Sequence, residues 1–541
     1  MKNKNNCGFL RNASVLVAAA MISRIVGLLY RSPMQAIIGI EGAGYYNFAY
    51  NVYSLLLLIS SYSIPLAVSK IVSERLATKQ YKNAYRIFRS ALIYAAIVGG
   101  VAALICWFFA GNLLPVSQQN AIPALRVLAP TIFFSAILGV LRGYMQAYNT
   151  MLPTSVSQIA EQLMNAFVSV LAAWILTSGI TDSESIAIQG AMGGTIGTGA
   201  GVIIALLFMC LVYSVNASSL KKRRMMDRTK EHESYPEIFK TIILIVTPVI
   251  FATCIYNLCT FVNQNIFAWL MALEGVGSKK VAELYGVFGN QYNPIMNIPI
   301  ALASASSTAI IPTISGSYST GDTENVRKSI GEAFQFTMFI AIPATVGLAV
   351  LAHPIMNLLF PSGDNTIAGN LLQIGAVSAI FYSLSTITQG ALQGIGKTFI
   401  PVRNAAISLA VNVILLVLLL KFTNMGIYAL VISTMVYSFG VSVLNGLSVR
   451  KFLDYKSDWM AVYGIPAVAA IGMGIVAFGL YHLLYILIRS NAVCLVIAIL
   501  VAVIVYIGLY LMIGKIPEEQ LLKLPKGRLL LKIAKKFRIY R

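Results

Sequence analysis

Long apolar stretches alternate with short polar breaks along almost the whole chain. An α-helix needs about 20 mainly apolar residues to cross the hydrocarbon core of a bilayer, and runs of about that length recur throughout. They begin near residues 9, 44, 84, 121, 153, 186, 237, 281, 328, 366, 398, 424, 459 and 491. The pattern predicts an all-α integral membrane protein with about 14 transmembrane helices.

Composition supports this class and argues against several others. Hydrophobic residues make up 58% of the 541 positions and charged residues 11%, which is more apolar length than a soluble core requires. The six cysteines and three histidines are scattered, so neither a disulfide framework nor a metal site is expected. No Ser-His-Asp set or Walker pattern appears, and we expect no enzyme activity and no cofactor. The glycine-rich segment 193–201 lies within an apolar run and predicts close helix packing.

The distribution of basic residues indicates the orientation of the chain in the membrane. Most of the 40 Lys and Arg fall at the N-terminus, between Lys70 and Arg89, in the 221–224 segment and in the C-terminal tail. The positive-inside rule places these segments, and so both termini, on the cytoplasmic side of the cell membrane. The first apolar run is too long for a cleaved signal and is expected to remain as a helix. Anionic lipid headgroups account for the net charge of +21, and no nucleic-acid partner is needed.

The chain repeats itself at an offset of 247 residues. This offset pairs identical residues, listed here: Pro65 with Pro312, Gly143 with Gly390, Gln146 with Gln393, and Asn165 with Asn412. Six helices per copy is an even number, so both copies cross the membrane in the same sense and form a parallel repeat. We expect the prolines to mark bends that allow the lobes to rock.

The repeat divides the chain into five parts. An N-lobe (1–220) and a C-lobe (237–450) hold six helices each and are joined by a basic cytoplasmic linker (221–236). Two extra helices follow (451–514). The tail (515–541) has apolar residues at helical spacing, which is typical of an amphipathic interfacial helix, although a simple topology anchor explains it equally well.

Two arginines, Arg24 and Arg31, lie inside the first apolar span, Phe9 to Ser32. A guanidinium near the middle of such a helix costs about 2.5 to 3.5 kcal/mol on insertion scales, which suggests that it has a use. A spacing of seven residues puts both side chains, with Gly27 between them, along one stripe that should face a polar cavity. Alternatively, Arg31 extends to the outer interface and only Arg24 is buried.

The fifth span carries a polar stripe. Ser157, Gln158, Glu161, Gln162 and Asn165 recur at spacings of three and four residues, so they share one helix face. In a bilayer this face must contact protein or water. It either lines a substrate path or forms hydrogen bonds between packed helices. Weaker, neutral versions of the signal occur in the seventh and eighth spans, where the candidates are Asn257, Gln291 and Asn293.

Several segments resemble a known superfamily. They are ISRIVGLLYRSPMQAIIGIEGAGYYNFAYNVYSLLLLISSYSIPLAVSKIVSERLA, QAYNTMLPTSVSQIAEQ, NIPIALASASSTAIIPTIS and QGALQGIGKTFIPVRN. Together they are similar to the polysaccharide-export branch of the multidrug, oligosaccharidyl-lipid and polysaccharide (MOP) exporters. Within this branch the chain resembles the stage V sporulation protein B and YtgP group, relatives of MurJ-type lipid II flippases.

The resemblance implies two six-helix lobes in a V around a cationic cavity, with an undecaprenyl-pyrophosphate-linked sugar as cargo. It also implies that the two last helices form a groove for the lipid tail. The family's Ser-Arg-x-x-Gly element matches Ser23, Arg24 and Gly27, whereas the second arginine of that helix is displaced by one residue, at Arg31. The second and eighth spans lack the interior arginines of better-known lipid II flippases, and the seventh lacks their acid. A sodium site therefore does not carry over.

The sequence thus predicts a monomeric flippase that moves lipid II from the inner to the outer leaflet by alternating access. Arg24 and Arg31 would hold the pyrophosphate. Ser23, Gly27, Gln158, Glu161, Gln162, Asn257, Gln291 and Asn293 would line the substrate path. A flippase for another lipid-linked oligosaccharide is the nearest alternative. A multidrug exporter is disfavoured because Arg24 repels cations, and a non-transporting scaffold would not need a buried arginine.

Overall fold

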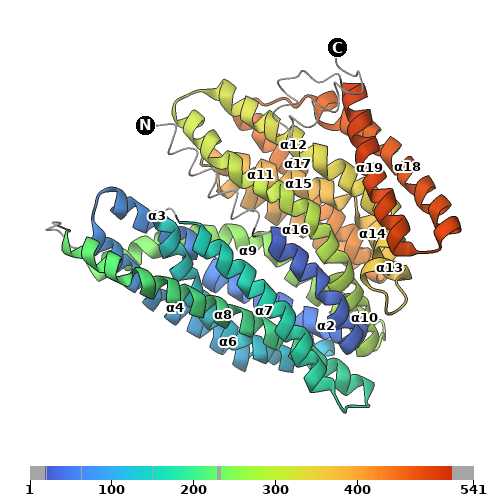
Figure 1. Ribbon diagram of the computed structural model, residues 1–541, viewed down its shortest axis with the longest axis horizontal. Coiled ribbons are helices and arrows are strands. Elements are labelled where there is room, and N and C mark those ends of the chain that lie inside the picture. The colour runs from blue at the N-terminus through green and yellow to red at the C-terminus, as the bar shows by residue number, and fades with distance from the viewer. Residues whose placement is uncertain (1–18, 20, 63, 149, 228–232, 515–541) are drawn as a thin grey trace. The chain divides into compact units, whose positions relative to one another are not determined.

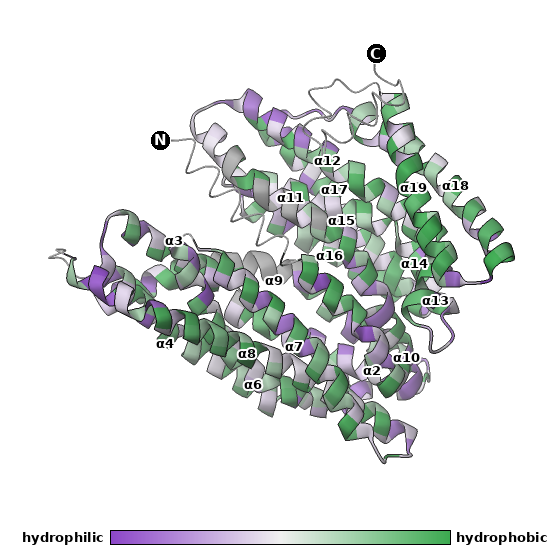
Figure 2. Ribbon diagram, viewed as in Figure 1, coloured by the Kyte–Doolittle hydropathy of each residue, from purple (hydrophilic) through white to green (hydrophobic). Residues whose placement is uncertain are grey.

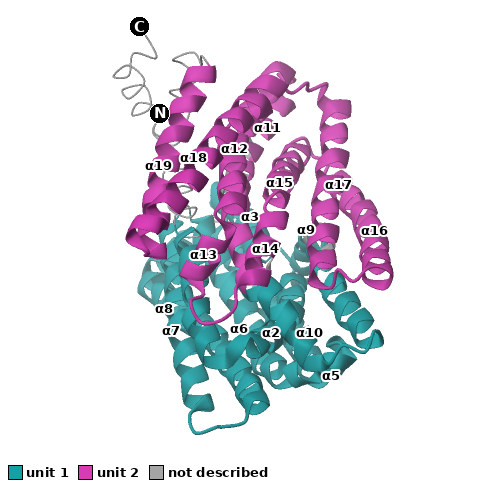
Figure 3. Ribbon diagram, turned by 90° about the vertical axis from the view of Figure 1, so that its right-hand side faces the viewer, with its two compact units in different colours: residues 1–290 teal, residues 291–541 magenta. Residues whose placement is uncertain are grey.

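The computed structural model describes residues 19, 21–62, 64–148, 150–227 and 233–514. The chain divides into two compact units, residues 1–290 and residues 291–541 (Figure 3). Throughout the described residues the secondary structure is helical. The predicted all-α class is confirmed.

Unit 1 contains most of the helices that carry the candidate residues (Figure 1). In chain order they are α2 (Arg31–Leu57), η1 (Leu58–Tyr62), α3 (Ile64–Ala77), α4 (Tyr81–Phe108), α5 (Ala110–Leu113), η2 (Val116–Ala121), α6 (Ile122–Ala147), α7 (Leu152–Thr177), α8 (Ser183–Met225), α9 (Tyr235–Leu273) and α10 (Ser278–Gly286). A short π-helix, η3 (Val287–Tyr292), follows α10. Helix α4 packs on α6, α6 packs on α8, and α8 packs on α7, while α2 contacts α6, α8 and α10.

Unit 2 continues with α11 (Asn293–Ser319), α12 (Thr323–Val350), α13 (Ala352–Leu359), α14 (Thr366–Gly375), α15 (Ser378–Gly394), α16 (Phe399–Phe422), α17 (Ile427–Leu453), η4 (Met460–Gly464), α18 (Ile465–Ile488) and α19 (Asn491–Gly514). The last two helices match the two extra spans expected after the repeat. They pack on each other, and α18 also packs on α12. Both are hydrophobic along almost their whole length, as expected of helices that face lipid (Figure 2).

Ten helices of the described residues are long and apolar enough to cross a membrane, and eleven if the bent pair α14–α15 counts as one span. Residues 31–77 form one of the ten, although this stretch is 47 residues long and contains a break at Gly39. Three further helical segments bring the total to the expected number of about fourteen. They are the long, apolar helices α9 and α11 and the helical segment before Gly39. The chain is a multi-pass membrane protein.

The first span ends later than the sequence suggested. Residues 21–29 are helical, and the backbone hydrogen bond from Met34 N to Tyr30 O carries the helix past Ser32 into α2. The break comes at Gly39, whose φ of 72° lies in the left-handed region that glycine adopts most easily. We call residues 21–38 the first helix. Its expected beginning near Phe9 lies outside the described residues.

A line of glycines joins α8 to α7, as the 193–201 segment predicted. A Cβ on Gly193 would lie 2.6 Å from the backbone of Ala173, and one on Gly197 would lie 2.1 Å from Ser169 Oγ. At Gly201 it would lie 2.5 Å from Glu161 O. The spacing of four residues keeps the three glycines on one face, so the helix backbones can approach closely.

The residues paired by the 247-residue offset occupy corresponding helices in the two copies. Gly143 of α6 packs on α3, where a Cβ would lie 2.6 Å from Pro65 O. Gly390 of α15 packs on α11, where a Cβ would lie 2.1 Å from Ser307 Oγ. Each copy therefore uses the same glycine to bring its second and fourth helices together. Pro65 is the second residue of α3, and the π-helix η1 interrupts the α-helical bonding before it.

Polar contacts stabilise one end of unit 1, which our predicted orientation places in the cytoplasm. Helix α8 continues through Arg224, beyond the start of the expected linker, because basic side chains suit a helix C-terminus. The Arg224 guanidinium lies 3.8 Å from the centre of the Tyr85 ring. The α4 N-terminus is capped from this segment, since Lys82 N donates to Asp227 Oδ2 at 2.6 Å.

Candidate substrate site in unit 1

The Ser-Arg-x-x-Gly element fastens the first helix to α7. Ser23 Oγ donates to Gln158 O at 3.4 Å, and a Cβ on Gly27 would lie 3.0 Å from Gln162 Nε2. Ser23 and Gly27 are thus small residues at the contact between the two helices. Arg24, one position beyond Ser23, has an exposed side chain. The element therefore positions this arginine next to the polar stripe of α7.

Arg31 is held inside unit 1 by the π-helix η3. Its Nη1 donates to Gly289 O at 2.8 Å and to Asn290 Oδ1 at 3.4 Å. Asn290 Nδ2 in turn donates to Gln35 Oε1 at 2.8 Å. This half-buried side chain bonds to protein and does not extend to an interface.

The acid of the α7 stripe has a partner that sequence reasoning did not assign. Arg142 Nη2 of α6 donates to Glu161 Oε2 at 2.7 Å, and Arg142 Nε donates to Ser157 Oγ at 2.9 Å. The side chains of Arg142 and Glu161 are 15% and 30% exposed. The only hint in the sequence was that an arginine and an acid both lie within neighbouring apolar spans.

Tyrosines and an amide of α2 complete the polar interior, and the sequence analysis did not select them. Tyr46 stacks on Tyr50 with 5.7 Å between ring centres, and the Tyr46 hydroxyl lies 3.3 Å from that of Tyr30. Asn51 Nδ2 donates to Gln264 Oε1 and to Tyr285 Oη, both at 2.8 Å. The spacing of four residues between Tyr46 and Tyr50 was the signal that could have found the tyrosine face, whereas Asn51 follows Tyr50 directly and points about 100° away from it.

The neutral candidates of the seventh and eighth spans, Asn257, Gln291 and Asn293, do not form one cluster with the first-helix and α7 candidates. Asn257 is exposed on α9. Gln291 and Asn293 belong to unit 2, where Gln291 is buried and its Nε2 donates to Asn365 Oδ1 at 3.3 Å. Asn293 is half-buried at the start of α11. The structure therefore brings together the first-helix and α7 candidates within unit 1, and their role in binding stays a prediction.

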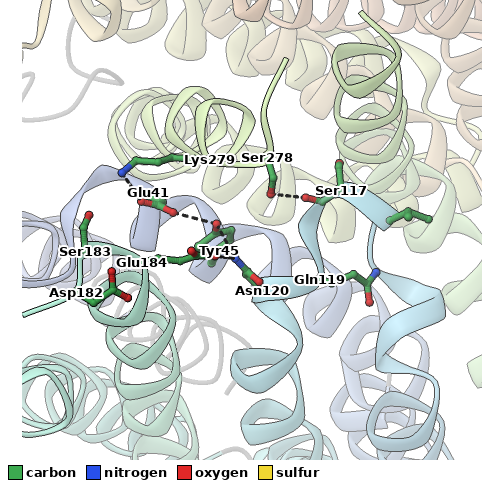
Figure 4. A pocket seen from close by; sticks show the side chains of 11 residues that line it. Glu41, Tyr45, Ser117, Gln119, Asn120, Asp182, Ser183, Glu184, Ser278 and Lys279 are labelled. Carbon is green, nitrogen blue, oxygen red and sulfur yellow. Dashed lines mark hydrogen bonds and ion pairs between the residues drawn. The ribbon is translucent and has the colours of Figure 1, made fainter. Parts of the chain in front are cut away.

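A polar pocket of about 610 Å³ lies at the end of unit 1 that our orientation places outside the cell (Figure 4). Glu41 is buried, accepts a hydrogen bond from Tyr45 Oη at 3.1 Å and lies 3.5 Å from Lys279 Nζ. Asn120 Nδ2 donates to Glu184 Oε1 at 2.8 Å. These contacts link α2, α10, η2 and α8. Among the described residues no group of acids, cysteines or histidines has the geometry of a metal site.

The polar interior described above fits a carrier for a charged, hydrophilic group, and comparison with known proteins supports this class. Residues 9–317 match the model of the polysaccharide biosynthesis protein family, and residues 248–418 match the MatE family. The chain belongs to the polysaccharide biosynthesis protein family.

The relatives that the chain resembles include lipid II flippases and a sporulation protein. The chain is 24% identical over 426 residues to lipid II flippase MurJ of Bacillus subtilis, covering 76% of this chain and 77% of the relative. It is 23% identical over 535 residues to stage V sporulation protein B of the same organism, covering 97% and 99%. The solved inward closed structure of lipid II flippase MurJ superposes with a TM-score of 0.65 at 18% identity, covering 91% of this chain and 97% of that one. The expected superfamily and fold are confirmed.

Proposed function

We propose that this protein moves lipid II, an undecaprenyl-pyrophosphate-linked cell-wall precursor, from the inner to the outer leaflet by alternating access. The observation that carries the proposal is the group of arginines on the membrane-spanning helices of unit 1. Arg24 and Arg31 lie on the first helix, and Arg142 lies on α6, where it pairs with Glu161 of α7. Intramembrane charges are costly and are usually functional.

The chemistry of the cargo suits this group. A pyrophosphate diester is a compact dianion, and guanidinium groups hold phosphate oxygens through paired, charge-assisted hydrogen bonds. Arg24 supplies such a group on an exposed part of the first helix. Asn and Tyr side chains of α2 provide the neutral donors and acceptors that a sugar-peptide headgroup needs. A cationic drug would be repelled by the same arginines.

The contacts of Arg31 support alternating access. Arg31 lies eight residues before Gly39, at the end of the first helix that our orientation places outside. Its bonds to η3 close the first helix against the segment that begins the eighth span. Opening that side requires these bonds to break, and a phosphate that enters the site can replace the carbonyl and amide oxygens as the acceptor.

Membrane potential is a sufficient driving force. An inside-negative potential of 100 mV favours outward movement of each negative charge by about 2.3 kcal/mol, so a dianion gains roughly 4 to 5 kcal/mol. The same field favours return of an empty, cationic site to the inside. Transport in vesicles whose potential is set by valinomycin and potassium should therefore rise with an inside-negative potential. A rate that does not respond would contradict this coupling.

The deciding experiment is complementation of a strain depleted of its lipid II flippase. Rescue by the unaltered chain, with loss of rescue in the Arg24→Ala variant at normal membrane abundance, would support lipid II as cargo. Lack of rescue by the unaltered chain would favour another lipid-linked oligosaccharide. In this proposal the chain acts as a monomer with cytoplasmic termini, and its basic segments contact anionic lipids.

A further inference from the structure

The ion pair between α6 and α7 is placed where a charge is expensive. Arg142 and Glu161 both lie within spans that are long and apolar enough to cross the membrane. Removing one partner of such a pair leaves an uncompensated charge, whereas replacing both by neutral residues is often harmless to stability. The pair therefore needs an explanation beyond holding two helices together.

The second copy of the repeat has no such pair. At an offset of 247 residues, Gln389 of α15 takes the place of Arg142, and Ser408 of α16 takes the place of Glu161. Ser408 is buried and its hydroxyl has no hydrogen-bond partner within the described part of the chain. Corresponding helices thus form with neutral residues at these positions. The fold does not require the charges, which points to a role in binding.

Arg142 has unused capacity to bind a ligand. A guanidinium carries five N–H donors. Two of its nitrogens, Nε and Nη2, bond to Ser157 and Glu161, and Nη1 makes no hydrogen bond to any described residue. Glu161 accepts through Oε2, and its other oxygen accepts no hydrogen bond from those residues. The bond to Ser157 can hold Arg142 in place while the partner of its outer nitrogens changes.

The pair also lies beside the first helix. Gln158 and Gln162, which flank Glu161 on the same face of α7, contact Ser23 and Gly27. Arg142, bonded to Glu161 on this face of α7, therefore lies near the side of α7 that contacts the first helix.

We infer that Arg142 is a third cation for the anionic headgroup and that Glu161 is its exchangeable counter-ion. This inference rests on the proposed function. Three arginines and one glutamate give the empty site a net charge of +2, which matches the two negative charges of a pyrophosphate diester. When the headgroup enters, Arg142 donates to phosphate oxygens in place of Glu161. The 30% exposed carboxylate then becomes hydrated.

The inference predicts that substitutions of Arg142 and of Glu161 change the affinity for the pyrophosphate lipid in opposite directions, and this is the test. The probe is lipid II, whose pyrophosphate is a diester, titrated into full-length protein in nanodiscs. Arg142→Gln should weaken binding by roughly tenfold or more, because hydrogen bonds to a charged group are lost. Glu161→Gln should strengthen binding by roughly threefold to tenfold, because the competing carboxylate is gone. Arg126→Gln, which removes an exposed charge from the same helix, is the matched control and should leave affinity unchanged.

A purely structural ion pair gives a different pattern. In that case both single variants weaken binding equally, and the charge-swapped variant R142E/E161R restores it, which would overturn the inference. If Arg142→Gln does not fold, Arg142→Lys replaces it and should bind several times more weakly than the unaltered protein while keeping its melting temperature. If the unaltered protein itself does not bind the probe, the proposed function fails, which is a separate outcome.

Discussion

Gly44 of α2 is the position at which a single methyl group should do most damage. A Cβ there would lie 2.0 Å from Ala282 O of α10 and 2.6 Å from Ala282 C. Real Cβ atoms stay beyond about 3.0 Å, so α10 would have to move by about 1 Å. Both atoms belong to the backbone and cannot rotate away.

Two opposing terms set the size of the effect. Alanine favours a helix interior over glycine by about 1 kcal/mol, whereas an overpacked contact costs about 1 to 3 kcal/mol and occasionally more. For Gly44→Ala we expect a net destabilisation of up to about 2 kcal/mol, since the hydrogen bond between Asn51 and Tyr285 of α10 must shift too. The measurement is thermal unfolding of the purified protein in detergent.

Gly100→Ala in α4 is the matched control. A Cβ at Gly100 would meet only Phe133 Cδ2, at 3.8 Å, which is an ordinary contact. This variant should be neutral or stabilised by up to about 1 kcal/mol. A Gly44→Ala protein that melts at or above the temperature of the Gly100→Ala protein would refute the reasoning from the close α2–α10 contact.

Three further results are expected. Arg24→Ala should abolish complementation at normal membrane abundance, and Arg24→Lys should restore it only in part because an ammonium lacks the planar fork; full complementation by Arg24→Ala would remove the basis for the site. Arg31→Ala should retain some transport but unfold at lower temperature, because its bonds to Gly289 and Asn290 are lost; unchanged melting would contradict their importance. Asp227→Ala should lower the free energy of unfolding by about 1 kcal/mol and speed hydrogen exchange at the start of α4, because the cap at Lys82 is lost. Hydrogen exchange followed by mass spectrometry is the measurement, and unchanged exchange would show that this cap is dispensable.

Periodicity and composition were enough to predict the helices, their approximate number and the two extra C-terminal spans. Periodicity and composition were enough because each membrane-spanning helix needs a continuous apolar segment of its own, and such a segment can be read directly from the sequence. The close packing at Gly193 and its neighbours was equally readable, since glycines at a spacing of four leave one face without side chains. The end of the first helix was not, because the sequence did not show that the helix would continue past Pro33 as far as Gly39.

The site was predicted only in part, for a physical reason. A helical spacing tells which residues share a face, but the neighbour of that face depends on the rotation of both helices about their axes. The α7 stripe was therefore visible, whereas the pairing of Glu161 with Arg142 was not. Arg31 donates to the backbone carbonyl of Gly289 as well as to the Asn290 side chain, and no pattern of side chains reveals a backbone acceptor.

The glycine contacts between α7 and α8 restrict how this protein can move. A slide of one helix along the other by a single residue, about 1.5 Å, would bring side chains into places where Gly193, Gly197 and Gly201 leave room only for hydrogen. The two helices must therefore travel as one rigid body during any conformational cycle. Glu161, whose backbone oxygen lies against Gly201, is carried with them, so rearrangements at this carboxylate have to come from its side chain and from the first helix.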